Sequence, residues 1–277
     1  MQGVFPFYLS LAGTTCKKEI SMSTVEIRQF ICRTDNFGVL LHDADSGSTI
    51  AIDAPEEAPI LKVLDEEGWN LTHILTTHHH GDHVAANEAL KARFGAIVVG
   101  PAAEADRIPG IDRQVAGGET FAIGAIAVEV LDTPGHTLGS ISYYMPGISA
   151  VFAGDALFSL GCGRLLEGTA PMLWESLQRL RALPDETMLY CGHEYTGSNA
   201  RFALSVDPKN LLLHERASEV ERLRVAGEPT LPVMLGREKK TNPFLRADDA
   251  TLAEEIGLSG QPPESVFAAL RSRKDTF

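Results

Sequence analysis

The chain contains a short internal run of side chains that can bind metal ions. Residues 77–83 read Thr-His-His-His-Gly-Asp-His. Imidazole and carboxylate groups are the ligands that suit zinc and related divalent ions. A chance polyhistidine run or an expression tag is the alternative interpretation. A tag lies at a terminus and lacks an embedded aspartate, so the run predicts a metal site.

The strand predicted just before this run sets the directions in which its histidine side chains point. Residues 72–77 (Thr-His-Ile-Leu-Thr-Thr) are typical of a strand. If the extended backbone continues, His78 and His80 point to one side, because side chains alternate along a strand. His79 points the other way and is predicted to be a spacer, or a group that supports the ligands.

A second pair of ligands is expected from a different direction. Gly81 permits a turn, and Asp82 and His83 then begin a helical pattern that extends over 84–94. One short peptide can therefore supply two ligands to each of two neighbouring ions. This arrangement is what a dinuclear hydrolase needs.

Three further candidate ligands follow other predicted strands. His136 lies in a Thr-Pro-Gly-His-Thr loop, Asp155 follows Ala-Gly at the end of an apolar strand, and His193 follows Tyr-Cys-Gly. Taken singly, a histidine there is a hydrogen-bonded rim residue and an aspartate is a turn former or helix cap. Three such positions downstream of the run at 77–83 favour a shared metal site.

The elements that must position these residues indicate an α/β domain followed by helices. Expected strands cover 25–32, 38–42, 49–52, 72–77, 96–100, 121–132, 140–145, 150–154 and 187–191, with helices over 58–67 and 171–183. Pro59 lies in the first turn of the earlier helix and Gly68 ends it, while Thr169 is a plausible cap of the later one. After His193, helical periodicity covers 198–206, 211–226 and 265–274.

The length, charge and cysteine content of the chain limit the classes of protein to which it can belong. The 277 residues suffice for one large or two smaller domains. The net charge of −13 argues against nucleic-acid binding, since phosphate would be repelled. No apolar run approaches the roughly 20 residues that span a bilayer. The four cysteines form no CxxC pair, which indicates a reducing cytoplasm.

The chain is predicted to have three parts. Residues 1–21 are expected to be a poorly ordered extension, because Met22 would make a natural start. Residues 22–193 form the metal-binding α/β domain, and residues 194–277 form a small helical domain.

The run at 77–83 resembles the Thr-His-x-His-x-Asp-His signature of the metallo-β-lactamase superfamily, with His136, Asp155 and His193 at its later ligand positions. That resemblance implies an αββα sandwich with metals at one edge. Within the superfamily the chain is similar to glyoxalase II, the hydroxyacylglutathione hydrolase family, from about residue 24 to the end. The closer similarity rests on the segments Gly-Asp-Ala-Leu-Phe at 154–158, Gly-Cys-Gly-Arg at 161–164, Glu-Gly-Thr at 167–169, Cys-Gly-His-Glu-Tyr-Thr at 191–196, Asn-Pro-Phe-Leu-Arg at 242–246 and Leu-Arg-Ser-Arg-Lys-Asp at 270–275.

The resemblance assigns the ligands to two divalent ions, zinc first, with iron or manganese as alternatives. The first ion would be held by His78, His80 and His136, the second by Asp82, His83 and His193, and Asp155 would bridge them. Asp82 and Asp155 would offset the charge of the ions. A hydroxide shared by the ions would attack the thioester of an S-2-hydroxyacylglutathione such as S-D-lactoylglutathione. Glutathione and a 2-hydroxy acid (D-lactate) would be released, as in methylglyoxal detoxification.

Basic residues near the C-terminus have two interpretations. Arg271 and Lys274, three positions apart, would be neighbours on a helix, and the simplest interpretation is a solvated face or a dipole complement. The family resemblance implies instead that they bind the glycine carboxylate of glutathione, and that Tyr195 contacts substrate. Arg164 replaces a lysine of many members, and Leu166 replaces an aromatic contact. The resemblance also suggests a monomer.

Four rival functions are distinguishable. A glutathione persulfide dioxygenase of the same superfamily would use one iron and would not be expected to carry the helical segment with Arg271 and Lys274. A β-lactamase or a phosphodiesterase-type nuclease leaves the C-terminal similarity unexplained. A metal-binding scaffold without turnover has no need of a second ion.

Overall fold

Two six-stranded sheets form the centre of the molecule. The computed structural model describes residues 25–277, so the extension predicted at 1–21 lies outside the described residues. The first sheet contains, in spatial order, β1 (Val25–Cys32), β2 (Asn36–Asp43), β3 (Ser48–Ile52), β4 (His73–Leu75), β5 (Ile97–Pro101) and β6 (Arg113–Val115). The second contains β14 (Val233–Met234), β13 (Met188–Tyr190), β10 (Ala150–Phe152), β9 (Ile141–Met145), β8 (Ile126–Asp132) and β7 (Thr120–Ile123).

Alternation along the strands builds a layered core. On β2, Val39 and Leu41 pack between the sheets against residues of the second sheet such as Val128 and Phe152. Leu40, between them in sequence, belongs instead to the cluster beneath the helices of the first sheet. Successive side chains of a strand point to opposite faces, so one apolar strand supplies two core layers.

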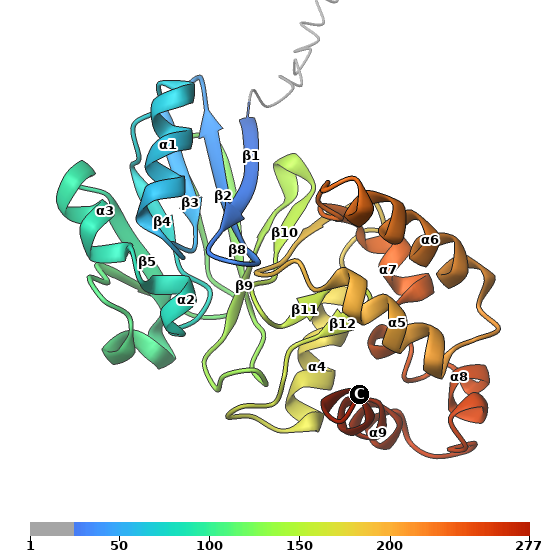
Figure 1. Ribbon diagram of the computed structural model, residues 1–277. Coiled ribbons are helices and arrows are strands. Elements are labelled where there is room, and N and C mark those ends of the chain that lie inside the picture. Colours follow the sequence, from blue (N-terminus) through green and yellow to red (C-terminus); the bar gives the residue numbers. More distant parts are fainter. Residues whose placement is uncertain (1–24) are drawn as a thin grey trace, which may run out of the picture.

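Helices cover both outer faces (Figure 1). On the first sheet lie α1 (Glu57–Glu67) and α3 (Asn87–Phe94), with the short α2 (Gly81–Val84) and the 3₁₀ helix η1 (Ala102–Arg107) in the connections. On the side of the second sheet lie α4 (Ala170–Arg181), α5 (Thr196–Val206), α7 (Leu235–Thr241), α8 (Ala250–Glu255) and α9 (Pro263–Asp275), while α6 (Leu211–Val225) packs on α5 and α7. The short 3₁₀ helices η2 (Pro146–Ile148) and η3 (Pro243–Leu245) complete the helical segments. The predicted αββα sandwich with a helical C-terminal region is confirmed.

Local signals account for the ends of the helices. Gly68 ends α1 with φ 68°, a left-handed conformation that glycine adopts without strain. Thr169 caps α4 by accepting a hydrogen bond from the backbone N–H of Met172, as its position predicts.

Two elements that were predicted to be continuous are each interrupted in the structure, so these predictions are wrong. The helix expected over 84–94 is two helices, α2 and α3, separated by Ala85 and Ala86. The strand expected over 121–132 is the hairpin β7–β8, which turns at Gly124 with φ 58°. Both errors come from apolar residues at the breaks, where no polar turn sequence marks the change of direction.

A small hairpin connects the second sheet with the C-terminal helices. It consists of β11 (Leu157–Phe158) and β12 (Gly161–Cys162), directly after Asp155. Asn242 donates hydrogen bonds to the carbonyl oxygens of Phe158 and Gly161, so the C-terminal region holds this hairpin in place. Among residues 25–277, no helix is long and apolar enough to cross a membrane.

Candidate metal centre

Three imidazoles converge from two loops to form a first cluster. His78 and His80 follow β4, and His136 lies in the loop between β8 and β9. His78 Nε2 lies 3.1 Å from His80 Nδ1, which in turn lies 3.0 Å from His136 Nε2. Ligands about 2.1 Å from a zinc ion, at right or tetrahedral angles, lie about 3.0–3.4 Å apart. The spacing of the three nitrogens therefore fits a common ion.

A second cluster lies beside the first. Asp82, His83 and His193 place one ligand atom each within 4.8 Å of the others. His193 Nε2 is 3.3 Å from Asp82 Oδ2, although the two residues come from α2 and from the loop after β13. The side-chain amide of Asn36 donates to both the carbonyl and the carboxylate of Asp82, which holds this carboxylate toward His193.

Asp155 lies between the two clusters. Its Oδ2 is 3.5 Å from His136 Nε2 and 3.4 Å from His193 Nε2. Its Oδ1 is 3.4 Å from His83 Nε2. Gly192 makes room for this carboxylate, because a Cβ at that position would lie 2.3 Å from Asp155 Oδ1.

Two buried atoms of the centre lack hydrogen-bond partners among residues 25–277. Asp155 Oδ1 and His83 Nε2 are buried and have no hydrogen-bond partner among the described residues. Burying polar atoms without partners costs free energy, and buried charges in proteins are paired or coordinate metals. The residues therefore fit a site for divalent ions, and the structure brings the side chains of all seven predicted ligands together.

Three hydrogen-bond acceptors outside the two clusters orient three of the imidazoles. Asp53 Oδ2 lies 2.8 Å from His83 Nδ1, Asp35 Oδ1 lies 2.9 Å from His193 Nδ1, and the Arg164 carbonyl lies 2.9 Å from His136 Nδ1. Such partners fix the ring so that its other nitrogen faces the ion. Asp53 and Asp35 are not among the residues predicted from the sequence. The signal that could have found Asp53 is its position directly after β3, at the same sheet edge as β4.

The histidines of the first cluster are in the protonation state that binds a metal. Burial, and then the neighbouring His83, hold the pKa of His78 well below its ordinary value, and burial also lowers the pKa of His80. Both rings are therefore neutral at pH 7, the form that binds a metal. Burial raises the pKa of Asp155, but His83 and His193 outweigh that effect and hold it well below the usual range. Asp155 is therefore a carboxylate.

Replacing Asp53 with asparagine is expected to weaken zinc binding at the His83 cluster by about 10–100-fold, as loss of an orienting partner does in other metal sites. The carboxylate also accepts hydrogen bonds from the backbone and the hydroxyl of Thr77, so both ligand loops lose support. Competition with a chromophoric chelator measures the affinity. The exposed Asp65→Asn on α1 is the control, and equal affinities in the two variants would contradict the assigned role.

A cavity of about 500 Å³ opens from the metal centre toward the C-terminal helices. His136 and Asp155 form one end of its lining. All four residues predicted to bind substrate line it as well: Arg164, Tyr195, Arg271 and Lys274. A protein of net charge −13 thus gathers three cationic side chains beside its metal centre.

The Arg271 side chain is buried and already hydrogen-bonded within the protein. Its side chain is 4 % exposed and donates to the Cys162 carbonyl at 2.9 Å and to Asp275 Oδ1 at 2.9 Å. Arg271 thereby fixes hairpin β11–β12 in addition to lining the cavity. Leu166, the other departure noted in the sequence, is 59 % exposed and does not line the cavity.

Tyr195 covers the metal centre from the substrate side. Its ring stacks on His193 with centroids 4.7 Å apart and planes at 6°. Phe158 meets the same ring edge-on at 5.3 Å. Burial, and then the nearby Asp35, raise the pKa of Tyr195 to about 12, so the phenol keeps its proton at neutral pH.

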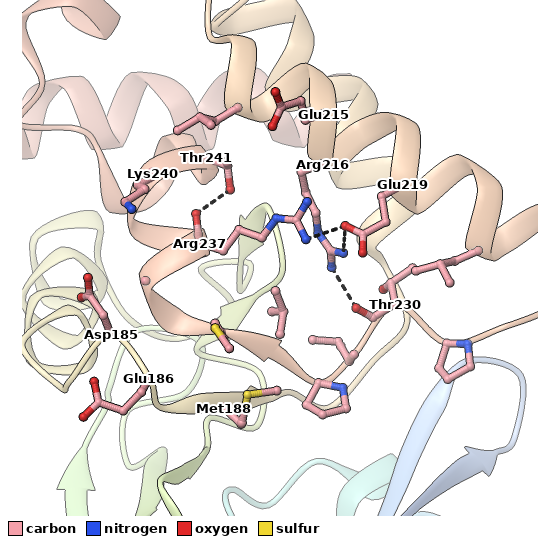
Figure 2. A pocket seen from close by; sticks show the side chains of 18 residues that line it. Asp185, Glu186, Met188, Glu215, Arg216, Glu219, Thr230, Arg237, Lys240 and Thr241 are labelled. Atoms are coloured by element: carbon pink, nitrogen blue, oxygen red, sulfur yellow. Dashed lines mark hydrogen bonds and ion pairs between the residues drawn. The ribbon is translucent and has the colours of Figure 1, made fainter.

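A larger hollow lies away from these ligands. It has a volume of about 780 Å³ and is bordered by α6, α7 and the segment leading into β14 (Figure 2). None of the seven predicted ligands lines it. Arg216 projects from α6 toward Glu219 and Thr230 at its wall.

Sequence models of known families match nearly the whole described chain. The model described as the metallo-beta-lactamase superfamily matches residues 44–193, and the one described as hydroxyacylglutathione hydrolase C-terminus matches residues 194–277. The chain is thus a member of the metallo-β-lactamase superfamily. Within it, the chain belongs to the hydroxyacylglutathione hydrolase family, as its C-terminal match and its relatives show.

Two relatives and one solved structure define the similarity. The hydroxyacylglutathione hydrolase of Rhizobium meliloti is 56% identical over 92% of this chain and 100% of its own length. That of Brucella anthropi is 56% identical over 91% of this chain and 97% of its own. The crystal structure of ETHE1 from Myxococcus xanthus aligns with a TM-score of 0.63 at 28% identity, over 91% of this chain and 99% of that one.

Proposed function

We propose that this protein is a metal-dependent thioesterase that hydrolyses S-2-hydroxyacylglutathione thioesters, S-D-lactoylglutathione among them. The products are glutathione and a 2-hydroxy acid, D-lactate for that substrate, which is the chemistry that detoxifies methylglyoxal. One observation carries the proposal: a single cavity joins His136 and Asp155 to the cationic side chains of Arg164, Arg271 and Lys274. The membership of the hydroxyacylglutathione hydrolase family supports it.

We assign the ligands to two ions according to the two clusters. His78, His80 and His136 would hold the first ion, and Asp82, His83 and His193 the second. Asp155 would contact both. Zinc is proposed in each position because imidazole and carboxylate suit it, while iron and manganese accept the same sets. When bound, two such ions lower the pKa of a water and polarise a thioester carbonyl.

The residues of the chain orient the substrate and balance charge. Glutathione carries two carboxylates, and Lys274 and Arg164 are cations that face the cavity in which its peptide would lie. The protonated phenol of Tyr195 is a hydrogen-bond donor next to His193. A thiolate leaves readily, so the chain needs to position the thioester rather than to protonate its sulfur.

The direct test is hydrolysis of S-D-lactoylglutathione by protein loaded with two equivalents of zinc, with thiol release as the readout. A thioester of γ-glutamylcysteine, which lacks the glycine carboxylate, is the matched control substrate. We expect fast cleavage of the first and a raised KM for the second. A fully metallated preparation that cleaves neither would refute the proposal.

A persulfide dioxygenase remains the rival to test in parallel. Oxygen uptake with glutathione persulfide and one iron per chain would favour it. The match of residues 194–277 to the hydroxyacylglutathione hydrolase C-terminus favours the hydrolase.

The protein is further proposed to act as a monomer in the cytoplasm. Cys32, Cys162 and Cys191 are buried and unpaired, which suits a reducing compartment. Sedimentation of the purified zinc protein would test the monomer.

Lys274 gives the reaction an expected pH dependence. Burial, and then the guanidinium groups of Arg271 and Arg201, lower the pKa of Lys274 to about 8. Because the folded pKa is lowered, the ammonium charge is lost as the pH rises through 8. We expect the KM for S-D-lactoylglutathione to rise by up to about tenfold per pH unit above that point.

The Lys274→Arg variant is the control for this prediction, since arginine stays charged throughout the range. Steady-state kinetics between pH 6.5 and 9 separate KM from kcat. An equal rise of KM with pH in both proteins would show that another group controls binding.

A further inference from the structure

A buried carboxylate outside the metal centre holds the back of the ligand loop. Glu104 lies on η1 and is 4 % exposed. Its Oε2 accepts hydrogen bonds from the backbone N–H of His79 at 2.8 Å and from His79 Nδ1 at 2.7 Å. Its Oε1 accepts the backbone N–H of Gly139 at 2.9 Å. One carboxylate therefore joins the loop of His78 and His80 to the loop of His136.

A second carboxylate repeats the arrangement on the other side of His79. Glu167 Oε1 lies 3.6 Å from His79 Nε2, and Glu167 Oε2 accepts the backbone N–H of Leu138 at 3.0 Å. Its own backbone N–H donates to the His136 carbonyl at 3.3 Å. Arg107 pairs with Glu167 at 2.7 Å and balances its charge.

The two ring nitrogens of His79 thus face carboxylates that are not among the predicted metal ligands. Its ring lies beside that of His80, with centroids 4.7 Å apart, but its nitrogens point to Glu104 and Glu167. A buried carboxylate costs free energy unless hydrogen bonds compensate it, and here three N–H groups do so. Each of these N–H groups belongs to a loop that carries first-cluster imidazoles.

We propose that His79, Glu104 and Glu167 form a loop clamp that sets the position of His136 relative to His78 and His80. They are positioning residues for the first of the two proposed ions and do not contact it. The inference rests on the metal assignment of the proposed function. It predicts that the loop clamp controls the zinc affinity of the first site and leaves the second site largely unchanged.

Zinc titrations of the full chain against a chromophoric chelator test the loop clamp. We expect Glu104→Ala to weaken one of the two zinc equivalents by about 10–100-fold, as loss of other supporting groups does. The other equivalent should keep its affinity within about threefold. Asp106→Asn, an exposed change on the same η1 helix, is the matched control and should bind like the wild type.

Two substitutions at His79 refine the test. Asparagine can still donate an N–H toward Glu104 from the place of Nδ1, whereas leucine cannot. His79→Asn should therefore retain most of the affinity that His79→Leu loses. These variants keep the loop clamp testable if Glu104→Ala fails to fold.

The outcomes separate the loop clamp from its alternatives. Equal weakening of both sites, or unchanged affinity in every variant, would overturn it. A third zinc equivalent in the wild type that His79→Leu abolishes would show that the cluster is itself a metal site. Because zinc binding is read without substrate, a protein inactive on glutathione thioesters would refute the proposed function and leave this result intact.

Discussion

Replacing Asp155 with asparagine is expected to lower kcat for S-D-lactoylglutathione by at least about 1,000-fold. The Asp155 carboxylate faces His136 in one cluster and His193 in the other, so both proposed ions lose a shared negative ligand. Metal stabilisation of reacting charge is worth several kcal/mol, and about 1.4 kcal/mol corresponds to tenfold in rate. Elemental analysis of the same sample should find fewer than two ions per chain.

Asp132→Asn is the control for this substitution. Asp132 is the last residue of β8 in the second sheet, is exposed, and accepts a hydrogen bond from the backbone N–H of Gly117. Its variant should keep full activity and two ions. An Asp155→Asn protein with two tightly bound ions and a kcat near that of the wild type would contradict the bridging role.

Replacing Arg216 with alanine is expected to lower the free energy of unfolding by about 3–5 kcal/mol, because a large buried side chain is removed and the buried Thr230 carbonyl loses a charged donor. Its side chain is 2 % exposed and donates to Glu219 at 3.0 Å and to the Thr230 carbonyl at 2.8 Å (Figure 2). It also reaches Ser159 Oγ at 3.3 Å, in the hairpin beside the substrate cavity. Urea unfolding measures the loss.

The exposed Arg222→Ala on the same helix is the control for Arg216 and should change stability by less than about 0.5 kcal/mol. The slope of the unfolding free energy against urea should stay equal in all three proteins, since the exposed surface on unfolding is the same. Equal midpoints for both variants would show that Arg216 contributes little.

Much of the centre could be predicted because its ligands follow local rules. The alternation of His78 and His80 and the turn at Gly81 depend only on backbone periodicity. The structure places both pairs as this reasoning expects: His78 and His80 lie together, and Asp82 and His83 lie with His193. The α/β domain followed by helices was predicted from apolar strands and intervening helices, whereas the αββα order of its layers was implied by the family resemblance.

Contacts between distant residues could not be predicted from spacing. The partners Asp53 and Asp35 meet their histidines only after the sheets form. The burial of Arg271 depends on the carbonyl oxygens of Cys162 and Gly163, more than 100 residues earlier. The break between α2 and α3 depends on the fold around Ala86, whose backbone N–H donates to the Ala54 carbonyl.

An anomalous difference map from a zinc-loaded crystal tests the dinuclear centre most directly. We expect two peaks per chain, about 3.5–4 Å apart, with the Asp155 carboxylate between them. The first peak should contact His136 and the second His193. A single peak at full occupancy, or an Asp155 carboxylate remote from both ions, would contradict the assignment.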